Sequence, residues 1–306
     1  MKPLILSFAL SSTAAFLAQK GLPSARLEAE LLLGSVLDLD RLQLYLQLDR
    51  PLTPKETADF KSVIKKRLSG QPLAYITGKK SFLKWDFFVN SSVLIPRPET
   101  ELLVEKTCAL LRGLLRTERQ TEAPLEALET QEREEIRLLE LGTGSGIIAI
   151  SLALYLPEVN IDAVDISPQA VALATENAKR LGVAERVAFY TGDLYQALPS
   201  TGKKEYKGIV SNPPYIPTAV VPTLSREVQT EPVVALDGGA DGFDFYRRIM
   251  ASAGKYLEED GFLAFEHGYD QSASLSDLAK QAGYDKISTY KDLAGHNRVL
   301  ICSRVD

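Results

Sequence analysis

From residue 137 to the end of the chain, short β-prone runs alternate with segments of helical periodicity. Such alternation predicts a doubly wound α/β fold, with a mostly parallel seven-stranded sheet and helices on both faces. The expected strands are 137–141, 160–165, 186–190, 206–211, 261–266, 286–290 and 298–302. The expected helices are 146–155, 168–181, 243–257 and 271–282. Because no helix fits between the last two strands, we expect them to form an antiparallel end of the sheet.

The chain before this region has a different character. Residues 1–70 show helical periodicity throughout and predict a small helical bundle. One of its helices is marked by Thr53 as N-cap, Pro54 at the first helical position and Glu56 completing a capping box. Residues 71–97 are β-prone and aromatic, which predicts a β-hairpin linker. A helix over 99–116 should follow, and then a charged stretch, 117–135, that we interpret as solvated surface.

The first 18 residues combine a lysine, an apolar run and small residues, a pattern shared by short secretory signal peptides. The alternative is an amphipathic helix of the bundle that begins near Ser11 or Ser12. We favour the helix, because Cys108 and Cys302 are the only cysteines and offer no disulfide framework. The same scarcity favours a reducing compartment, and we expect a cytoplasmic protein.

The composition narrows the class of ligand. The 306 residues carry a net charge of -5, whereas a protein whose main ligand is duplex DNA usually has a basic excess. The two histidines, His267 and His296, have no spacing typical of a metal site, so we expect no metal. No apolar run reaches the roughly 18 residues that a membrane span needs.

A glycine-rich run, 140–146, connects the first expected strand of the sheet to the following helix. Its spacing is G-x-G-x-G and not the G-x-G-x-x-G of dinucleotide-binding turns, which favours a zwitterionic amino-acid tail over a pyrophosphate. Asp165 ends the next strand, where a carboxylate can accept both hydroxyls of a ribose. Asp162 lies inside that strand and is interpreted as structural. Asp193 follows the third strand and is either an adenine-side residue or an ordinary turn former.

Asn212, Pro213, Pro214 and Tyr215 follow directly on the strand expected at 206–211. Two prolines and an aromatic residue predict a rigid loop at the carboxyl edge of the sheet, where ligands bind in open α/β folds. An amide nitrogen is a poor nucleophile, because its lone pair is delocalised into the carbonyl. A site that accepts both of its hydrogens, through the Asn212 oxygen and the Pro213 carbonyl, would aim that lone pair at a methyl group. Tyr215 would supply an aromatic wall beside a sulfonium.

This loop resembles the N-P-P-Y motif of amino-methyltransferases, which modify N6 of adenine, N4 of cytosine or N5 of glutamine. Further motifs, spread over nearly the whole chain, resemble one branch of that superfamily, the HemK-like release-factor glutamine methyltransferases. These motifs are 24–32, 71–78, 94–101, 231–232, 235–236, 261–262, 266–268 and 298–299.

The resemblance implies the Rossmann-like fold of class I S-adenosylmethionine-dependent methyltransferases. It also implies S-adenosylmethionine as the methyl donor, S-adenosylhomocysteine as its product, and the glutamine of the Gly-Gly-Gln motif in translation release factors as the acceptor. Residues 1–70 would dock the substrate, 71–97 would form the hairpin linker, and 98–306 would bind the cofactor. We expect the protein to act as a monomer, without binding nucleic acid or membrane directly.

The resemblance also assigns site residues. The catalytic and substrate-binding residues are Asn212, Pro213, Pro214 and Tyr215. The cofactor-binding residues are Glu140, Gly142, Thr143, Gly144, Ser145, Gly146, Asp165, Ile166, Asp193, Leu194 and Asn212. The loop closing over the cofactor is Arg97, Pro98, Glu99 and Thr100. Three features depart from the family pattern: Glu140 stands where Asp is commoner, Leu194 where some members carry an aromatic, and the acidic stretch is long.

Two alternatives share these motifs. The first is a ribosomal-protein glutamine methyltransferase of the same branch, which the motifs alone hardly distinguish from a release-factor methyltransferase. A DNA N6-adenine methyltransferase needs a basic region to hold the backbone while the base is flipped, which the acidic charge balance disfavours. His267 is left out of the site, because a sulfonium methyl donor needs little help from a base. Catalysis is expected to be mostly positioning.

Overall fold

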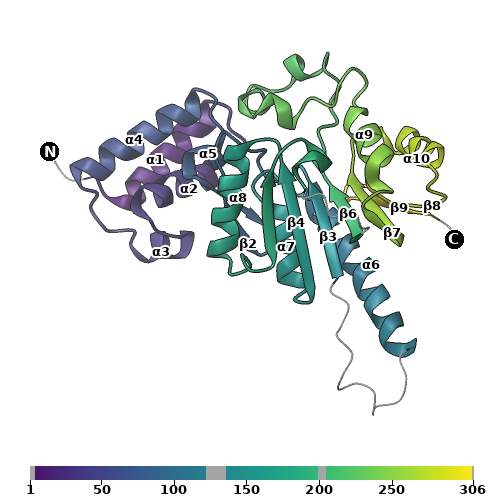
Figure 1. Cartoon of the computed structure of the whole chain (residues 1–306). Helices are drawn as coiled ribbons and strands as arrows, with labels where there is room; N and C mark the ends of the chain where they lie inside the picture. Colours follow the sequence, from purple (N-terminus) through teal and green to yellow (C-terminus); the bar gives the residue numbers. More distant parts are fainter. Residues whose placement is uncertain (1–3, 122–135, 199–204, 305–306) are drawn as a thin grey trace, which may run out of the picture. The chain divides into compact units, whose positions relative to one another are not determined.

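The structure is a computed structural model that describes residues 4–121, 136–198 and 205–304, with side chains left undescribed in 115–121. The chain divides into two compact units. The first contains Met1–Lys79 and Ser225–Thr230, and the second contains Lys80–Leu224 and Glu231–Asp306. Figure 1 labels the elements of both units, which are described in turn.

Helices account for most of the first unit. They are α1 (Leu6–Gln19), α2 (Ala25–Leu37), α3 (Arg41–Leu46), α4 (Pro54–Leu68) and α5 (Leu73–Thr77). Leucines of α1 and α2 form its apolar core together with Phe60 of α4. The predicted capping box is confirmed: the Thr53 hydroxyl accepts from Glu56 N at 3.2 Å, and the Glu56 carboxylate accepts from Thr53 N at 2.8 Å.

Two expectations for this unit are wrong. Helix α1 begins at Leu6, well before Ser11, because Leu6 N donates to Arg50 O at 2.9 Å and buried leucines of its first turns join the core. The β-prone segment that includes Tyr75 and Ile76 forms helix α5, with the N–H groups of both residues donating to Pro72 O. In both places contacts made on folding outweigh local residue preference.

The segment Ser225–Thr230 is tied to the first unit by charge. Arg67 donates to both carboxylate oxygens of Glu28, at 2.6 and 3.0 Å, and its Nη2 lies 2.8 Å from a carboxylate oxygen of Glu227. Arg67 and Glu28 are buried, where a charge is tolerated only if it is paired. This chain segment therefore joins the helical unit although it lies far from it in sequence.

The second unit is built on a seven-stranded sheet with the order β5-β4-β3-β6-β7-β9-β8. Its strands are β3 (Ile136–Leu141), β4 (Val159–Asp165), β5 (Val187–Thr191), β6 (Tyr206–Ser211), β7 (Leu257–Glu266), β8 (Lys286–Lys291) and β9 (Asn297–Ser303). Strands β3 to β7 pair in parallel, whereas β9 is antiparallel to both β7 and β8. The predicted fold class and its antiparallel end are confirmed.

Helices cover both faces of this sheet (Figure 1). Helices α6 (Glu99–Thr121), α7 (Ile147–Tyr155) and α8 (Pro168–Arg180) share one apolar core with the strands. Helices α9 (Asp244–Ala253) and α10 (Ser272–Gln281) share the core of the opposite face. Helix α9 ends earlier than the expected residue 257, because Leu257 already pairs with Tyr206 as the first residue of β7.

Smaller elements complete the unit. A two-stranded hairpin is formed by β1 (Lys79–Phe82) and β2 (Trp85–Phe88). Short 3-10 turns are η2 (Leu194–Ala197), η3 (Val221–Thr223), η4 (Val228–Thr230), which belongs to the first unit, and η5 (Val233–Ala235). Helix α6 extends past the expected residue 116, while residues 122–135 of the acidic stretch lie outside the described residues. Among the described helices, none has the length and apolar character to cross a membrane.

Candidate active site

A cavity opens at the carboxyl ends of β3, β4, β5 and β6, around the point where the strand order reverses. Ligands bind at such switch points in open α/β sheets. It encloses about 1140 Å³, open space at its mouth included. Loop 92–97, loop 232–235 and helix α9 supply the remaining walls.

The glycine run after β3 forms the floor of the cavity. Gly142 and Gly144 have φ of +79° and +56°, and a Cβ on either would meet nothing within 4 Å, so the backbone faces open space. Gly146 serves a different purpose, because a Cβ there would lie 2.8 Å from Ile150 Cδ1 and 3.1 Å from Ala174 Cβ. Gly146 allows α7 and α8 to pack closely and does not line the cavity.

Glu140 lies buried beneath this run with one oxygen unsatisfied. Its Oε2 accepts from the Thr143 hydroxyl at 2.5 Å and from Ala149 N at 3.1 Å, whereas its Oε1 has no partner. Burial raises the pKa of Glu140 to about 8. A buried acceptor of this kind, at the wall of a cavity, suits a cationic group of a ligand.

Asp165 ends β4 and turns its carboxylate toward the glycine run. Its Oδ2 accepts from Gly144 N at 2.8 Å and its Oδ1 from Ser167 N at 2.9 Å. Burial raises the pKa of Asp165, while these backbone N–H groups act in the opposite direction. Each oxygen keeps a lone pair for a further donor. Asp162 is structural as expected, since its Oδ2 accepts from Arg137 and from the Tyr206 hydroxyl, both at 2.6 Å.

The wall after β5 includes a pair of residues that the sequence did not single out. Arg248 of α9 donates to the Asp193 carboxylate at 2.5 Å, and Phe245 lines the cavity one turn before it. Leu194 follows with φ of +50°, and Ile166 stands half exposed at the mouth. The sequence predicted Asp193, Leu194 and Ile166, whereas the only signal for Phe245 and Arg248 was an aromatic and an arginine three positions apart on a half-buried helix.

Asn212 begins the loop after β6 and faces the cavity together with Pro213 and Pro214. Its side-chain nitrogen Nδ2 donates to the Thr100 hydroxyl at 3.2 Å. Thr100 lies in the first turn of α6 and is 1% exposed. The preceding residue, Ser211, holds the end of the strand by donating from its hydroxyl to Leu141 O at 2.6 Å.

Tyr215 does not line the cavity, in contrast to the three residues before it. Its ring packs against the core under α9 and α10, and its carbonyl accepts from Gln271 Nε2 at 2.9 Å. Two glycines of the following loop lie against its backbone. A Cβ on Gly238 would lie 2.7 Å from Tyr215 Cα, and a Cβ on Gly242 would lie 2.4 Å from Tyr215 O. The loop after Asn212 is therefore held on the side away from the cavity by Gln271 and by the close approach of Gly238 and Gly242.

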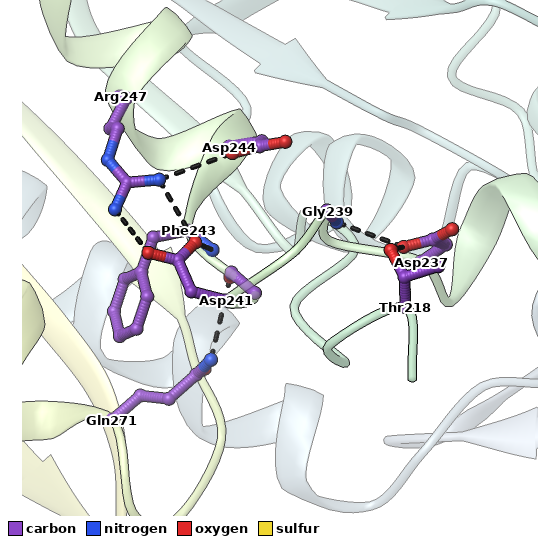
Figure 2. Close-up of polar contacts among 9 residues, drawn as sticks. Thr218, Asp237, Gly239, Asp241, Phe243, Asp244, Arg247 and Gln271 are labelled. Atoms are coloured by element: carbon purple, nitrogen blue, oxygen red, sulfur yellow. Dashed lines mark hydrogen bonds and ion pairs between the residues drawn. The ribbon is translucent and has the colours of Figure 1, made fainter. Parts of the chain in front are cut away.

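Figure 2 shows how this bracing loop is itself held by polar contacts. The Thr218 hydroxyl donates to Asp237 at 2.7 Å, and Gly239 N donates to the same carboxylate at 2.9 Å. Arg247 of α9 binds the Asp241 carboxylate with two nitrogens, at 3.0 and 2.5 Å. These exposed contacts order a segment whose glycines allow it to approach the Tyr215 backbone.

Arg97 and Thr100 of the expected closing loop line the cavity, whereas Pro98 and Glu99 do not. Arg97 donates to the buried carboxylate of Glu231, which also accepts from Ile95 N at 2.9 Å. Glu231 therefore joins the loops on two sides of the cavity. Residues 231–232 are one of the motifs that resemble the family, but the sequence alone assigns Glu231 no role.

The cavity thus collects most of the residues predicted for the site. Those that line it are Arg97, Thr100, Glu140, Gly142, Thr143, Gly144, Ser145, Asp165, Ile166, Asp193, Leu194, Asn212, Pro213 and Pro214. His267 is fully buried away from it, with Nδ1 2.8 Å from Gly268 O, and burial lowers its pKa.

Fold and family comparisons agree on the class. Residues 9–78 match the family described as PrmC N-terminal domain, and residues 116–227 match the one described as Methyltransferase small domain. The fold is similar to the hMettl16 catalytic domain, with a TM-score of 0.53 and 14% identity over 96% of this chain and 92% of that chain. It is also similar to the human methyltransferase 10 domain containing protein, with a TM-score of 0.50 and 17% identity over 81% and 98%. Fold and site together define a methyltransferase.

Curated relatives give the particular family. The chain is 41% identical over 297 residues to the release factor glutamine methyltransferase of Moorella thermoacetica, covering 97% of each. It is 41% identical over 292 residues to the one of Geobacter sulfurreducens, covering 95% of this chain and 94% of that protein. The chain therefore belongs to the release factor glutamine methyltransferase family, which confirms the resemblance seen in the sequence.

Proposed function

We propose that this protein transfers the methyl group of S-adenosylmethionine to the side-chain amide nitrogen of the glutamine in the Gly-Gly-Gln motif of translation release factors. Family membership supports the reaction and the substrate. The observation that carries the proposal is the position of Asn212, Pro213 and Pro214 on the wall of the cavity, directly after β6. On this proposal the protein acts in the cytoplasm, as a monomer, and recognises a protein and not a nucleic acid.

The residues of the cavity fit the cofactor. Gly142 and Gly144 leave open space against the backbone, and Glu140 offers a buried oxygen without a partner. We assign the amino-acid end of the cofactor to these residues and its ribose to Asp165, whose carboxylate can still accept hydroxyl groups. When bound, the cofactor supplies a methyl group activated by its sulfonium charge.

The residues of the Asn212 loop orient the acceptor. Since Asn212 Nδ2 donates to Thr100, the amide presents its Oδ1 as the acceptor for a substrate N–H. The Pro213 carbonyl is assigned the second N–H. Holding both hydrogens directs the nitrogen lone pair along one line, and this positioning, with exclusion of water, is the main source of rate acceleration. No side chain needs to remove a proton before transfer, because the methylated nitrogen loses its proton readily.

The helical unit is proposed to dock the release factor. Helix α3 exposes Leu42 and Leu46, which are 69% and 76% exposed, and α1 exposes Phe8 and Phe16. Large exposed apolar side chains that gather on one unit are typical of a protein-binding surface. A protein substrate needs about 800 Å² of contact on each partner, which a single glutamine in a cavity does not provide.

The proposal is tested by incubating the protein and S-adenosylmethionine with a purified release factor. Three other targets are tested in parallel: the same factor with the motif glutamine replaced by glutamate, a ribosomal-protein preparation, and duplex DNA. We expect methyl incorporation into the intact release factor alone. Equal incorporation into the glutamate variant, or preferential incorporation into ribosomal protein or DNA, would contradict the proposed substrate.

A further inference from the structure

Two buried residues that do not share an element with Asn212 surround its side chain. In the ladder between β6 and β7, Ser211 lies opposite Phe265, so the next residues, Asn212 and Glu266, come at the same edge of the sheet, where Glu266 is the last residue of β7. Glu266 is 1% exposed and its backbone carbonyl accepts from the Tyr246 hydroxyl at 2.8 Å. Thr100 reaches the same point from α6.

These side chains form a connected polar group. Asn212 Nδ2 donates to Thr100 Oγ1 at 3.2 Å. Hydrogen bonding by the Thr100 and Asn212 side chains acts to lower the pKa of Glu266, against the larger effect of burial. The second carboxylate oxygen, Oε2, is buried without a partner. An ionised carboxylate only accepts hydrogen bonds, so every group that faces it must present a donor. For Asn212 that donor is Nδ2.

We propose, on the basis of the proposed function, that Thr100 and Glu266 are positioning residues that fix the side-chain amide of Asn212 with its oxygen toward the substrate. The two ends of an asparagine amide are nearly equal in shape, and only hydrogen bonding distinguishes them. In the reversed orientation Nδ2 would face the N–H groups of the glutamine, donor against donor. A threonine hydroxyl can donate as well as accept, so it is the ionised Glu266 carboxylate, which only accepts, that excludes this orientation before the substrate arrives.

Direct proton transfer by Glu266 is a poorer explanation of its position. Glu266 does not line the cavity, and its unpartnered oxygen is shielded from solvent. A carboxylate that cannot reach the substrate acts through the residue it contacts. Its effect should therefore disappear when Asn212 is removed.

The test uses the full-length protein and two readouts. Thr100→Val removes the hydroxyl at nearly constant shape, Thr100→Ser keeps it, and Glu266→Gln replaces the pure acceptor by a group that also donates. Single-turnover methylation of a purified release factor with saturating S-adenosylmethionine should slow by roughly 10- to 100-fold in Thr100→Val and Glu266→Gln. Thr100→Ser should recover most of the loss, and cofactor affinity in Glu266→Gln, which lies outside the cavity wall, should change by less than about threefold.

A double-mutant cycle separates positioning from general damage. In the Asn212→Ala background, Thr100→Val and Glu266→Gln should cost no further rate, since the group on which they act is absent. Losses that multiply in the double variants, or a Thr100→Val protein as fast as wild type, would overturn the inference.

The second readout does not depend on the substrate. The side-chain amide resonances of Asn212, identified by their absence in Asn212→Ala, should move in Thr100→Val and Glu266→Gln and return toward wild type in Thr100→Ser. Unmoved resonances would overturn the inference whatever the activity. Moved resonances in a protein that methylates no release factor would leave the positioning role in place and reject the proposed function.

Discussion

The side-chain nitrogen of Asn212 donates to the hydroxyl of Thr100 across 3.2 Å, although the two residues are 112 positions apart in the chain. One follows the strand β6 and the other begins the helix α6, so the contact exists only once the sheet and its covering helix have assembled. It links the loop after β6 to the first turn of α6. The orientation of the Asn212 amide is therefore a property of the whole fold.

The first prediction concerns Asn212 itself. Asn212→Ala removes the acceptor and leaves a substrate donor unpaired, which costs about 1–3 kcal/mol. Misplacement of the nitrogen by about 1 Å adds roughly a hundredfold. Single-turnover rates should fall by about two to four decades while cofactor affinity changes far less. Asn212→Asp keeps an acceptor but loses the donor to Thr100 and faces Glu266, so it should be intermediate. An alanine variant as fast as wild type would show that another group holds the nitrogen.

The second prediction concerns Asp165. If its carboxylate accepts the ribose hydroxyls, each bond contributes about 1.5–3 kcal/mol. Asp165→Ala should then weaken S-adenosylmethionine binding by at least about tenfold, measured by calorimetry. Asp165→Asn is the matched control, because it has nearly the same shape, keeps one of the two acceptor oxygens and should lose less. Unchanged affinity in a folded alanine variant removes Asp165 from the cofactor site.

The third prediction is a pH dependence. Burial raises the pKa of Glu266 to about 7, and the ionised form is the one that accepts only donors. The charge of Glu99 also raises that pKa, whereas the charge of Arg298 lowers it. The single-turnover rate should therefore rise between about pH 6 and 8, as Glu266 loses its proton.

The control for this pH profile is Glu266→Gln, which has no proton to lose. Its rate should stay low, and the rise through about pH 7 should be absent. A glutamine variant that retains the wild-type acid limb would assign the titration to another group. Rates must be measured at saturating cofactor, because burial also raises the pKa of Glu140, a proposed cofactor-binding residue, to about 8.

The fourth prediction concerns the helical unit. Leu42→Ser combined with Leu46→Ser removes exposed apolar surface from α3 without touching the core. The KM for an intact release factor should rise by roughly 10-fold or more, while a short Gly-Gly-Gln peptide is methylated at the wild-type rate. Lys55→Ser, at an exposed position of α4, is the matched control. Equal KM values for the intact factor in all three proteins would contradict docking through α3.

Features that depend on neighbours in sequence were predictable. The capping box of Thr53 and Glu56 needs only four consecutive residues, and the position of Asp165 at a strand end follows from the alternation of apolar runs. The predicted start of α1 was wrong because its position depends on contacts with residues far along the chain. Leu6 N donates to Arg50 O, and Ile5 forms a β-bridge with Pro51.

The unforeseen part of the site consists of side chains brought in from distant elements. Arg248 meets Asp193, and Thr100 meets Asn212, because distant elements pack together and not because of any local motif. Glu231 was visible as part of a motif, but its contact with the loop at Ile95 spans 136 positions. Residue type and spacing identify candidates near strand ends, and only the assembled fold shows which of them touch.

The most direct test of the account is fragment mass spectrometry of a purified release factor after incubation with this protein and S-adenosylmethionine. The account predicts one added methyl group, carried by the glutamine of the Gly-Gly-Gln peptide with the wild-type protein and nearly absent after the same time with Asn212→Ala. A methyl group on any other residue, or equal glutamine methylation by the two proteins, would contradict it.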